Sequence, residues 1–396
     1  QRTGDDGGPG LALWLAANPA ATLAPRNLDP RTTALLLATS GTTGLPKAAA
    51  LTSRGLTASM GRLLLVPLGY QSGPRKGRDL LLAALPLTHV MGFIGVLGAM
   101  AAGIPFVHQA RFDAAQMLDL IEQRRPNTFV GVPTMYADLE RAGAAERDLS
   151  SIQLFISGAD VMPPDRARRF QEMGALGHLA GRGIGSATFV DGYGMVELSG
   201  AAALRIYPPA ATARIKIPSF AVALPGFRVR AVGADGEPVG RGEVGELQFA
   251  GPGVTSGYEG RPGTGPDADG WFSTGDQGRV WAGGVFAFSG RSKDRLKVGG
   301  FSVFPAEVEH ELRKHPQVQD VAIVGLPDER LGERPVALVV SVDDAFDQDE
   351  FLAWAAEHVA GYRRPRACAT VDDLPRGNHG KLDRSAATAA AAALLP

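Results

Sequence analysis

The chain carries, directly after the apolar run Ala34–Ala38, the sequence Thr39-Ser40-Gly41-Thr42-Thr43-Gly44-Leu45-Pro46-Lys47. A strand ending in such a loop suits a polyphosphate, because glycines let the backbone come close while hydroxyls, N–H groups and an ammonium face the oxygens. The Walker pattern does not fit, since Pro46 precedes the lysine and Ala48 follows it. The simpler alternative is a polar surface loop. We expect a phosphate-binding loop.

The composition is that of a globular enzyme. The 396 residues suffice for two or three domains, and 45% of them are hydrophobic and 20% charged. With 40 basic and 41 acidic residues, the net charge of −1 creates no overall field for nucleic acid or an anionic membrane. Cys368 is the only cysteine, which excludes an intrachain disulfide and a cysteine-rich metal site. No apolar run reaches the length of a bilayer span, and we expect a cytoplasmic protein.

Short apolar runs alternate with amphipathic stretches from Thr33 onward, which predicts layered α/β structure. The expected strands are Leu80–Leu85, Phe129–Val132 and Leu154–Ile156, and the expected helices are Ala114–Arg124 and Asp165–Met173. Between Phe227 and Phe288, short β-type runs separated by Gly and Pro indicate a β-rich subdomain.

The pattern of apolar residues changes again near Arg291. The pattern predicts helices over Phe304–Lys314 and Gln348–His358 and strands over Val318–Val324 and Val336–Val340. We therefore expect a large N-terminal domain over 1–290 and a small α+β C-terminal domain over 291–396.

Four further segments carry polar residues that packing does not explain. They are Gly192-Tyr193-Gly194-Met195-Val196-Glu197, Ser273-Thr274-Gly275-Asp276, Gly290-Arg291-Ser292-Lys293-Asp294-Arg295-Leu296-Lys297-Val298-Gly299-Gly300 and Pro375-Arg376-Gly377-Asn378-His379-Gly380-Lys381-Leu382-Asp383-Arg384. Taken singly, each segment is explained equally well as a solvated turn. Together with the first loop, they indicate a ligand with phosphates, a ribose and a base.

In this order and spacing the five segments resemble the adenylate-forming superfamily, which contains acyl-CoA synthetases, nonribosomal-peptide adenylation domains and beetle luciferases. The resemblance covers 29–384. It implies an AMP-binding N-terminal domain of layered sheets and helices and a small mobile C-terminal lid with a hinge near 291–294. It also implies ATP, Mg²⁺, a small-molecule carboxylic acid and coenzyme A as ligands.

The resemblance implies a nucleotide-binding role for three groups of residues. The first loop would hold the β- and γ-phosphates through Thr39, Ser40, Gly41, Thr42, Thr43, Gly44 and Lys47. Tyr193 would stack on adenine, with Gly158, Ala159 and Gly194 beside it. Asp276 would accept hydrogen bonds from the ribose hydroxyls, with Arg291 nearby.

The same resemblance implies the catalytic roles. Glu197 would bind Mg²⁺, which prefers carboxylate and phosphate oxygens. Lys381 would bridge the substrate carboxylate and the α-phosphate as a mobile positive charge, although alone it would be taken for a surface lysine. Lys293 would be the hinge about which the lid rotates between two half-reactions, which brings Gly299-Gly300-Phe301 to the thiol acceptor.

The resemblance also places the acyl pocket. His89 would close it, although a histidine in an apolar stretch is more often a core residue; Phe93, Val132, Met135 and Gly200 would line it. This lining fits an aliphatic or aryl acid better than an amino acid. Arg205 lies eight residues after Glu197, where relatives that activate malonate-like diacids carry an arginine, and it defines a minor alternative substrate class.

Two departures from the family pattern bear on activity. Val196 replaces the hydroxyl residue before the magnesium glutamate, and only 38 residues precede the loop, fewer than the resemblance implies. The usual N-terminal portion would then be lost, naturally shortened or supplied by a second polypeptide. The main hypothesis is an acyl-CoA ligase. The alternatives are an acyl-AMP ligase that loads a carrier protein or an amine, and a degenerate adenylate-binding protein.

Overall fold

The computed structural model describes residues 29–39, 47–65, 79–109, 111–179, 182–208, 220–343, 345–377 and 381–395, with the side chains of 62–65 excepted. Contacts divide the chain into residues 1–32 and 33–396. The first unit is described only over 29–32, a turn in which Arg31 pairs with Asp29. All described helices and strands belong to the second unit.

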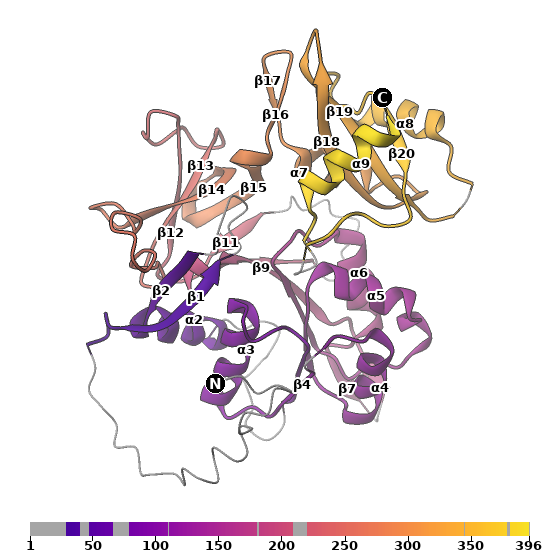
Figure 1. Cartoon of the computed structure of the whole chain (residues 1–396). Helices are drawn as coiled ribbons and strands as arrows, with labels where there is room; N and C mark the ends of the chain where they lie inside the picture. Colours follow the sequence, from indigo (N-terminus) through magenta and orange to yellow (C-terminus); the bar gives the residue numbers. More distant parts are fainter. Residues whose placement is uncertain are drawn as a thin grey trace, which may run out of the picture. The chain divides into compact units, whose positions relative to one another are not determined.

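An 11-stranded sheet organises the larger part of the second unit. Its parallel half has the order β4 (Phe106–His108), β3 (Leu81–Ala83), β5 (Thr128–Val130), β6 (Leu154–Gly158) and β9 (Thr188–Met195). Successive parallel strands need crossover connections, which α4 (Ala114–Arg124), α5 (Pro133–Arg141) and α6 (Pro164–Met173) supply (Figure 1). The predicted α/β alternation is confirmed.

The antiparallel half continues the same sheet from β9. It runs through β10 (Gly200–Ile206), β11 (Ala221–Ala223), β15 (Val285–Arg291), β14 (Trp271–Val280), β13 (Val244–Ala250) and β12 (Arg228–Val232). The predicted β-rich texture between Phe227 and Phe288 is therefore present, as an extension of the main sheet. A separate short hairpin joins β7 (Gly177–Leu179) and β8 (Arg182–Ile184).

The two faces of the parallel half have different roles. Along β6, Phe155 faces the layer of α4, α5 and α6, where it packs with Phe129 and Tyr136 in a fully buried aromatic core. Leu154 and Ile156 point to the opposite face, because successive strand residues alternate. That opposite face becomes the wall of a cavity.

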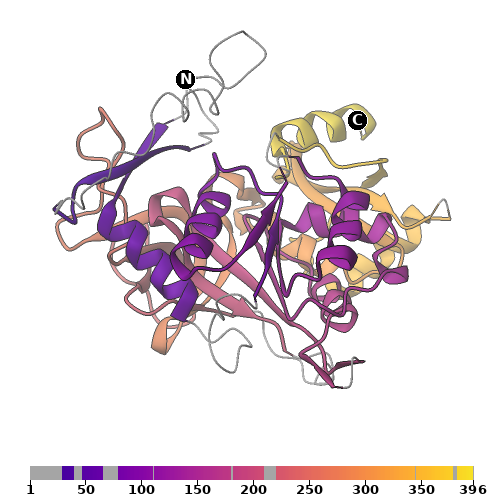
Figure 2. The same cartoon turned by 90° about the horizontal axis from the view of Figure 1, so that it is seen from below.

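Two helices and a hairpin accompany this second face. The hairpin of β1 (Thr33–Thr39) and β2 (Lys47–Thr52) contacts α2 (Ser53–Leu65), which packs beside α3 (Val90–Ala102) (Figure 2). The strand predicted before the phosphate loop is β1, whereas Ser40, Gly41, Thr42, Thr43 and Gly44 lie outside the described residues. Gly92 lets α3 approach the preceding segment, because a Cβ there would lie 2.4 Å from the Pro86 carbonyl oxygen.

The C-terminal part has its own five-stranded sheet, with β16 (Leu296–Val298), β17 (Phe301–Val303), β18 (Val318–Asp328), β19 (Gly332–Ser341) and β20 (Cys368–Thr370). One apolar core includes residues of α7 (Pro305–Leu312) and α8 (Gln348–His358). A second includes residues of α9 (Arg384–Leu394). The predicted helices and strands are all present. The boundary at residue 290 and the hinge stay predictions.

No helix in the described ranges is long and apolar enough to cross a membrane.

Candidate active site

A cavity of about 1280 Å³ lies where the parallel strands β3, β5, β6 and β9 end. Carboxyl ends of parallel strands meet at one edge of a sheet, so loops that follow different strands converge there. The cavity brings together these predicted site residues: Thr39, Lys47, His89, Val132, Met135, Gly158, Ala159, Gly194, Glu197, Gly200, Arg291, Lys293 and Lys381. Segments separated by more than 300 residues thus share one cavity.

Glu197 stands at the polar end of the cavity, in a short turn (Val196–Leu198) that follows β9. Its Oε1 accepts a 2.7 Å hydrogen bond from the hydroxyl of Tyr258. The ammonium of Lys47 lies 5.2 Å from the centre of the Tyr258 ring, within the range of a cation–π contact. Burial, followed by the hydrogen bond to Glu197, raises the pKa of Tyr258, so its hydroxyl remains a donor.

Sequence reasoning missed Tyr258. It lies between glycines, in Ser256-Gly257-Tyr258-Glu259-Gly260, and this string has no charge pattern that distinguishes it from a surface turn. Tyr193 is flanked by glycines in Gly192-Tyr193-Gly194, and the same glycine-flanked pattern at Tyr258 is the signal that could have indicated it.

One carboxylate at this end of the cavity, that of Glu197, suits a magnesium ion. No group of three or more His, Cys, Asp or Glu side chains suited to a metal occurs among the described residues. Mg²⁺ commonly uses one or two carboxylates together with substrate phosphates and several waters. Glu197, whose Oε1 accepts from Tyr258 and whose Oε2 remains, could supply one such carboxylate near Lys47, and its role as the magnesium ligand stays a prediction.

Asp276 and Tyr193 form a buried pair beside the cavity. Asp276 is 2% exposed, and its Oδ2 accepts a 2.7 Å hydrogen bond from the Tyr193 hydroxyl. Arg291 Nε lies 3.1 Å from the other carboxylate oxygen. Burial raises the pKa of Asp276, whereas Arg291 acts to lower it. The carboxylate thus already has two partners.

The ring of Tyr193 packs within the protein. It stacks on Phe249 with ring centres 5.5 Å apart and meets the edge of Phe286. Neither Tyr193 nor Asp276 is among the cavity-lining residues, which at this place are Ser273, Thr274 and Gly275. Adenine stacking by Tyr193 and ribose binding by Asp276 stay predictions, and Asp276 Oδ1 accepts no hydrogen bond from a described residue.

Lys381 lines the cavity and is exposed to solvent. Desolvation of its ammonium, and then the charge of Arg291, lower the pKa of Lys381, while the carboxylates of Asp160, Asp276 and Glu197 act to raise it. Lys293, the predicted hinge residue, also lines the cavity, and partial burial lowers its pKa. Two lysines with depressed pKa values and Arg291 therefore form a cationic side of the site.

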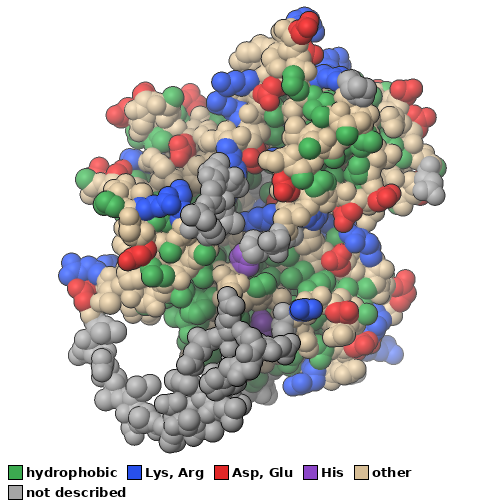
Figure 3. All heavy atoms as spheres, in the orientation of Figure 1, with side chains coloured by type: hydrophobic (Ala, Val, Ile, Leu, Met, Phe, Trp, Pro, Cys, Tyr) green, Lys and Arg blue, Asp and Glu red, His purple; other side chains and the backbone are tan. Residues whose placement is uncertain are grey.

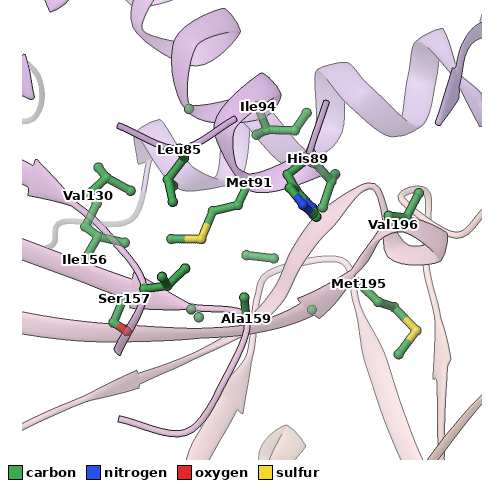
Figure 4. A pocket seen from close by; sticks show the side chains of 18 of the residues that line it. Leu85, His89, Met91, Ile94, Val130, Ile156, Ser157, Ala159, Met195 and Val196 are labelled. Atoms are coloured by element: carbon green, nitrogen blue, oxygen red, sulfur yellow. The ribbon is translucent and has the colours of Figure 1, made fainter. Parts of the chain in front are cut away.

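The opposite end of the cavity is apolar. Figure 4 shows Leu85, Met91, Val130 and Ile156 gathered on one side, with His89 between them and Val196. On the face seen in Figure 3, apolar side chains surround the histidines in the lower half of the molecule. The position of His89, just before α3, agrees with the predicted location near the pocket, and its closing role stays a prediction.

Two residues expected in the acyl pocket, Phe93 and Arg205, lie elsewhere. Phe93 packs in the cluster around Leu37 and Leu51, and its neighbour Ile94 lines the cavity instead. One residue along a helix changes the direction of the side chain by about 100°, so the choice between neighbours depends on how α3 is rotated.

Arg205 is not a cavity residue either. It lies on β10 opposite Asp191 of β9, and its guanidinium donates to that carboxylate over 2.8 Å and to the Met162 carbonyl over 3.0 Å. Leu204 faces the cavity, so strand alternation directs Arg205 to the other side of the sheet. The structure thus corrects the expectation of an arginine that binds a distal carboxylate.

We expect Arg205→Ala to destabilise the fold by about 3–5 kcal/mol, because it leaves the buried Asp191 carboxylate unpaired. Burial, only partly offset by Arg205, already raises the pKa of Asp191 to about 6. Removal of Arg205 raises this pKa further, so the loss of stability should shrink as the pH falls from 8 towards 6, below which the carboxyl is protonated in both proteins. Urea unfolding of the parent protein and the variant from pH 5 to 8 measures this loss of stability. Arg168→Ala, which removes an exposed 3.7 Å pair with Asp165, should change little. An equal loss in both variants would contradict the expectation.

Comparisons with known proteins agree with this geometry. Residues 6–259 match the AMP-binding enzyme family, and residues 307–381 match the AMP-binding enzyme C-terminal domain. Feruloyl-CoA synthase of Amycolatopsis is 37% identical over 356 residues, which cover 88% of this chain and 68% of the relative. Indoleacetate–CoA ligase of Aromatoleum aromaticum is 34% identical over 363 residues, which cover 90% of this chain and 66% of the relative.

Solved structures show the same fold. ATP-bound MatB from Rhodopseudomonas palustris superposes with a TM-score of 0.79 at 28% identity. The match covers 97% of this chain and 73% of the MatB chain. The anthranilate CoA ligase AuaEII in complex with anthranoyl-AMP superposes with a TM-score of 0.76 at 26% identity. The match covers 91% of this chain and 68% of the AuaEII chain. This chain spans about two thirds of the length of the curated relatives above.

The fold and the site define a nucleotide-dependent enzyme with a two-part architecture. The chain belongs to the AMP-binding enzyme family. Within it, the chain is an AMP-forming acid–thiol ligase, which uses ATP and Mg²⁺ to activate a carboxylic acid and forms the coenzyme A thioester.

Proposed function

We propose that the acid is an apolar aryl acid, such as an arylpropenoic or arylacetic acid. The observation that carries this is the apolar end of the cavity, walled by Leu85, Met91, Val130 and Ile156. Two relatives act, by their names, on ferulate and indoleacetate, both aryl acids. A diacid fits poorly, because Arg205 pairs with Asp191 on the other side of the sheet.

A further charge argues against a diacid. Asp138 of α5 lines the cavity and pairs with Arg141 over 2.9 Å. Its negative charge would repel a second carboxylate and tolerate a neutral ring. An aryl acid therefore suits both the apolar wall and this acidic edge.

The proposed first half-reaction divides the site by charge. Lys47 and the loop before it hold the β- and γ-phosphates, and Lys381 draws the substrate carboxylate towards the α-phosphorus, where its ammonium offsets the negative charge of the transition state. Glu197 would hold Mg²⁺ together with the phosphates, and the bound ion would supply positive charge that offsets the charge of the phosphate oxygens. The carboxylate oxygen bonds to the α-phosphorus as the bond to pyrophosphate breaks, which gives an acyl-adenylate.

In the proposed second half-reaction, the C-terminal lid turns about Lys293, which lies in the short turn Ser292–Asp294 after β15. The thiolate of coenzyme A attacks the acyl carbon, and AMP leaves. Gly299 and Gly300 both have positive φ (57° and 85°) at the turn between β16 and β17, so this hairpin presents bare backbone that a thiol arm can approach.

A panel of carboxylic acids tests the proposal. Purified protein with Mg-ATP should release pyrophosphate with arylpropenoic or arylacetic acids more readily than with malonate or amino acids. Adding coenzyme A should then yield AMP and the thioester, whereas a preference for a carrier protein or an amine would favour the alternative ligase. Tight AMP binding with no release for any acid would favour an adenylate-binding protein and overturn the proposal.

The depth of the acyl pocket gives a second test. Gly98 of α3 lines the cavity, and a Cβ built there meets nothing within 4 Å. Gly98→Leu should therefore occupy pocket volume and reduce kcat/KM for a ferulate-like acid about 10- to 200-fold, while small acids are affected less. Gly61→Leu is the matched control, because Gly61 is also a helix glycine with open space but lies outside the cavity lining. Equal losses for large and small acids would contradict the expectation.

A further inference from the structure

Tyr258 contacts two charged groups that are 150 residues apart in the sequence. Its hydroxyl donates to Glu197 Oε1 over 2.7 Å, and the Lys47 ammonium lies 5.2 Å from the centre of its ring. Glu197 is the proposed magnesium ligand, and Lys47 ends the phosphate loop. One half-buried phenol thus contacts both the anion and the cation that would face the same metal–polyphosphate group.

Backbone hydrogen bonds fix the Tyr258 segment to both partners. Strand β2, which begins at Lys47, exchanges two hydrogen bonds of 2.9 and 2.8 Å with residues 257 and 259. On the other side, Thr255 N donates to the carbonyl oxygen of Glu197 over 2.7 Å. The segment is therefore joined to the phosphate-loop hairpin and to the Glu197 turn at once. A shift of either one would move the phenol.

The chemistry of a tyrosine suits this position. A neutral hydroxyl donates one hydrogen bond to a carboxylate, which holds that oxygen and leaves the second oxygen for a metal. Groups that hydrogen-bond a metal-binding carboxylate orient it. Removing such a group commonly lowers metal affinity or activity about 10- to 100-fold. The ring face attracts an ammonium without neutralising its charge, so Lys47 stays available to phosphate oxygens.

We propose that Tyr258 is a positioning residue for the metal–phosphate end of the site. Its hydroxyl sets the direction of the Glu197 carboxylate towards Mg²⁺, and its ring face holds the Lys47 ammonium towards the phosphates. This rests on the proposed roles of Glu197 and Lys47. Tyr258 itself contacts neither the metal nor the reacting atoms.

The test separates the two contacts without turnover. Tyr258→Phe removes the hydroxyl and keeps the ring, so Mn²⁺ should bind about tenfold more weakly to protein saturated with AMP and pyrophosphate, as measured from the paramagnetic resonance of free Mn²⁺. Pyrophosphate affinity in the absence of metal should not change. Tyr258→Leu removes the ring too and should weaken metal-free pyrophosphate binding as well.

Tyr207→Phe is the control, since it removes another buried hydroxyl of this domain, which donates to the Met162 carbonyl. It should bind Mn²⁺ like the parent protein, and melting temperatures identify any variant that fails to fold. Parent-like Mn²⁺ affinity in folded Tyr258→Phe would overturn the role of Tyr258 alone. A parent protein that binds no Mn²⁺ with AMP and pyrophosphate would overturn the role of Glu197 and this inference with it.

Discussion

Replacing Lys381 with alanine should lower the rate of acyl-adenylate formation about 100- to 1000-fold, the usual effect of removing one group that stabilises transition-state charge. Lys381 lines the cavity beside Arg291, and its ammonium forms no ion pair with a described residue, so it is available to a substrate carboxylate. Thioester formation from supplied acyl-adenylate should be largely retained, because the α-phosphate bond is already made. Pyrophosphate release and thioester formation, assayed separately, measure the two effects.

The matched control is Lys314→Ala. Lys314 is an exposed lysine of the same C-terminal part, paired with Glu311 at 2.6 Å and absent from the cavity lining, so both half-reactions should be unchanged. Crowding by protein atoms and the nearby Arg291 lower the pKa of Lys381, so adenylation should decline at an alkaline pH below that of an ordinary lysine. Full adenylation by Lys381→Ala would remove the basis for its assignment.

Glu197→Gln should reduce adenylation about 100- to 1000-fold, because charge stabilisation by a bound metal supplies several kcal/mol and each ~1.4 kcal/mol is a factor of ten. The amide keeps the size of the side chain and an oxygen that can accept from Tyr258, but it loses the negative charge that holds a cation. Excess Mg²⁺ should restore part of the rate. Pyrophosphate release as a function of Mg²⁺ concentration measures the change.

Glu259→Gln provides the comparison for this variant. Glu259 is an exposed carboxylate adjacent to Tyr258, and it is not among the cavity-lining residues. Its Mg²⁺ dependence should match that of the parent protein. If both glutamine variants respond to Mg²⁺ alike, the effect reflects surface charge, and Glu197 is not the metal ligand.

Much of the fold follows from local patterns. The strands around Phe129 and Leu154 and the helix over Ala114–Arg124 were predictable because apolar periodicity differs between strand and helix. The continuity of the β-rich region with the large sheet was not predictable, since the pairing of β9 with β10 and of β11 with β15 depends on contacts distant in sequence. Periodicity identifies elements, and pairing requires the assembled sheet.

The candidate site divides in the same way. The resemblance of five ordered polar segments to adenylate-forming enzymes pointed to Glu197, Arg291 and Lys381, and the cavity brings all three together. Phe93 was assigned to the pocket, but the rotation of α3 buries it and exposes Ile94 to the cavity. The glycine-flanked pattern could have indicated Tyr258, but its contact with Glu197, 61 residues away, is visible only in the folded chain.

By itself, the sequence indicated the class of chemistry, because five segments rich in glycine, hydroxyl and charged residues occur in the order and spacing that resemble adenylate-forming enzymes. Only the tertiary structure decided which side chains face the cavity. Arg205 pairs with Asp191 because it alternates with Leu204 on β10, and Tyr258 reaches Glu197 because its segment is bonded to β2. The direction of a side chain depends on the face of its strand or helix and on its packed neighbours, which the type and spacing of residues do not specify.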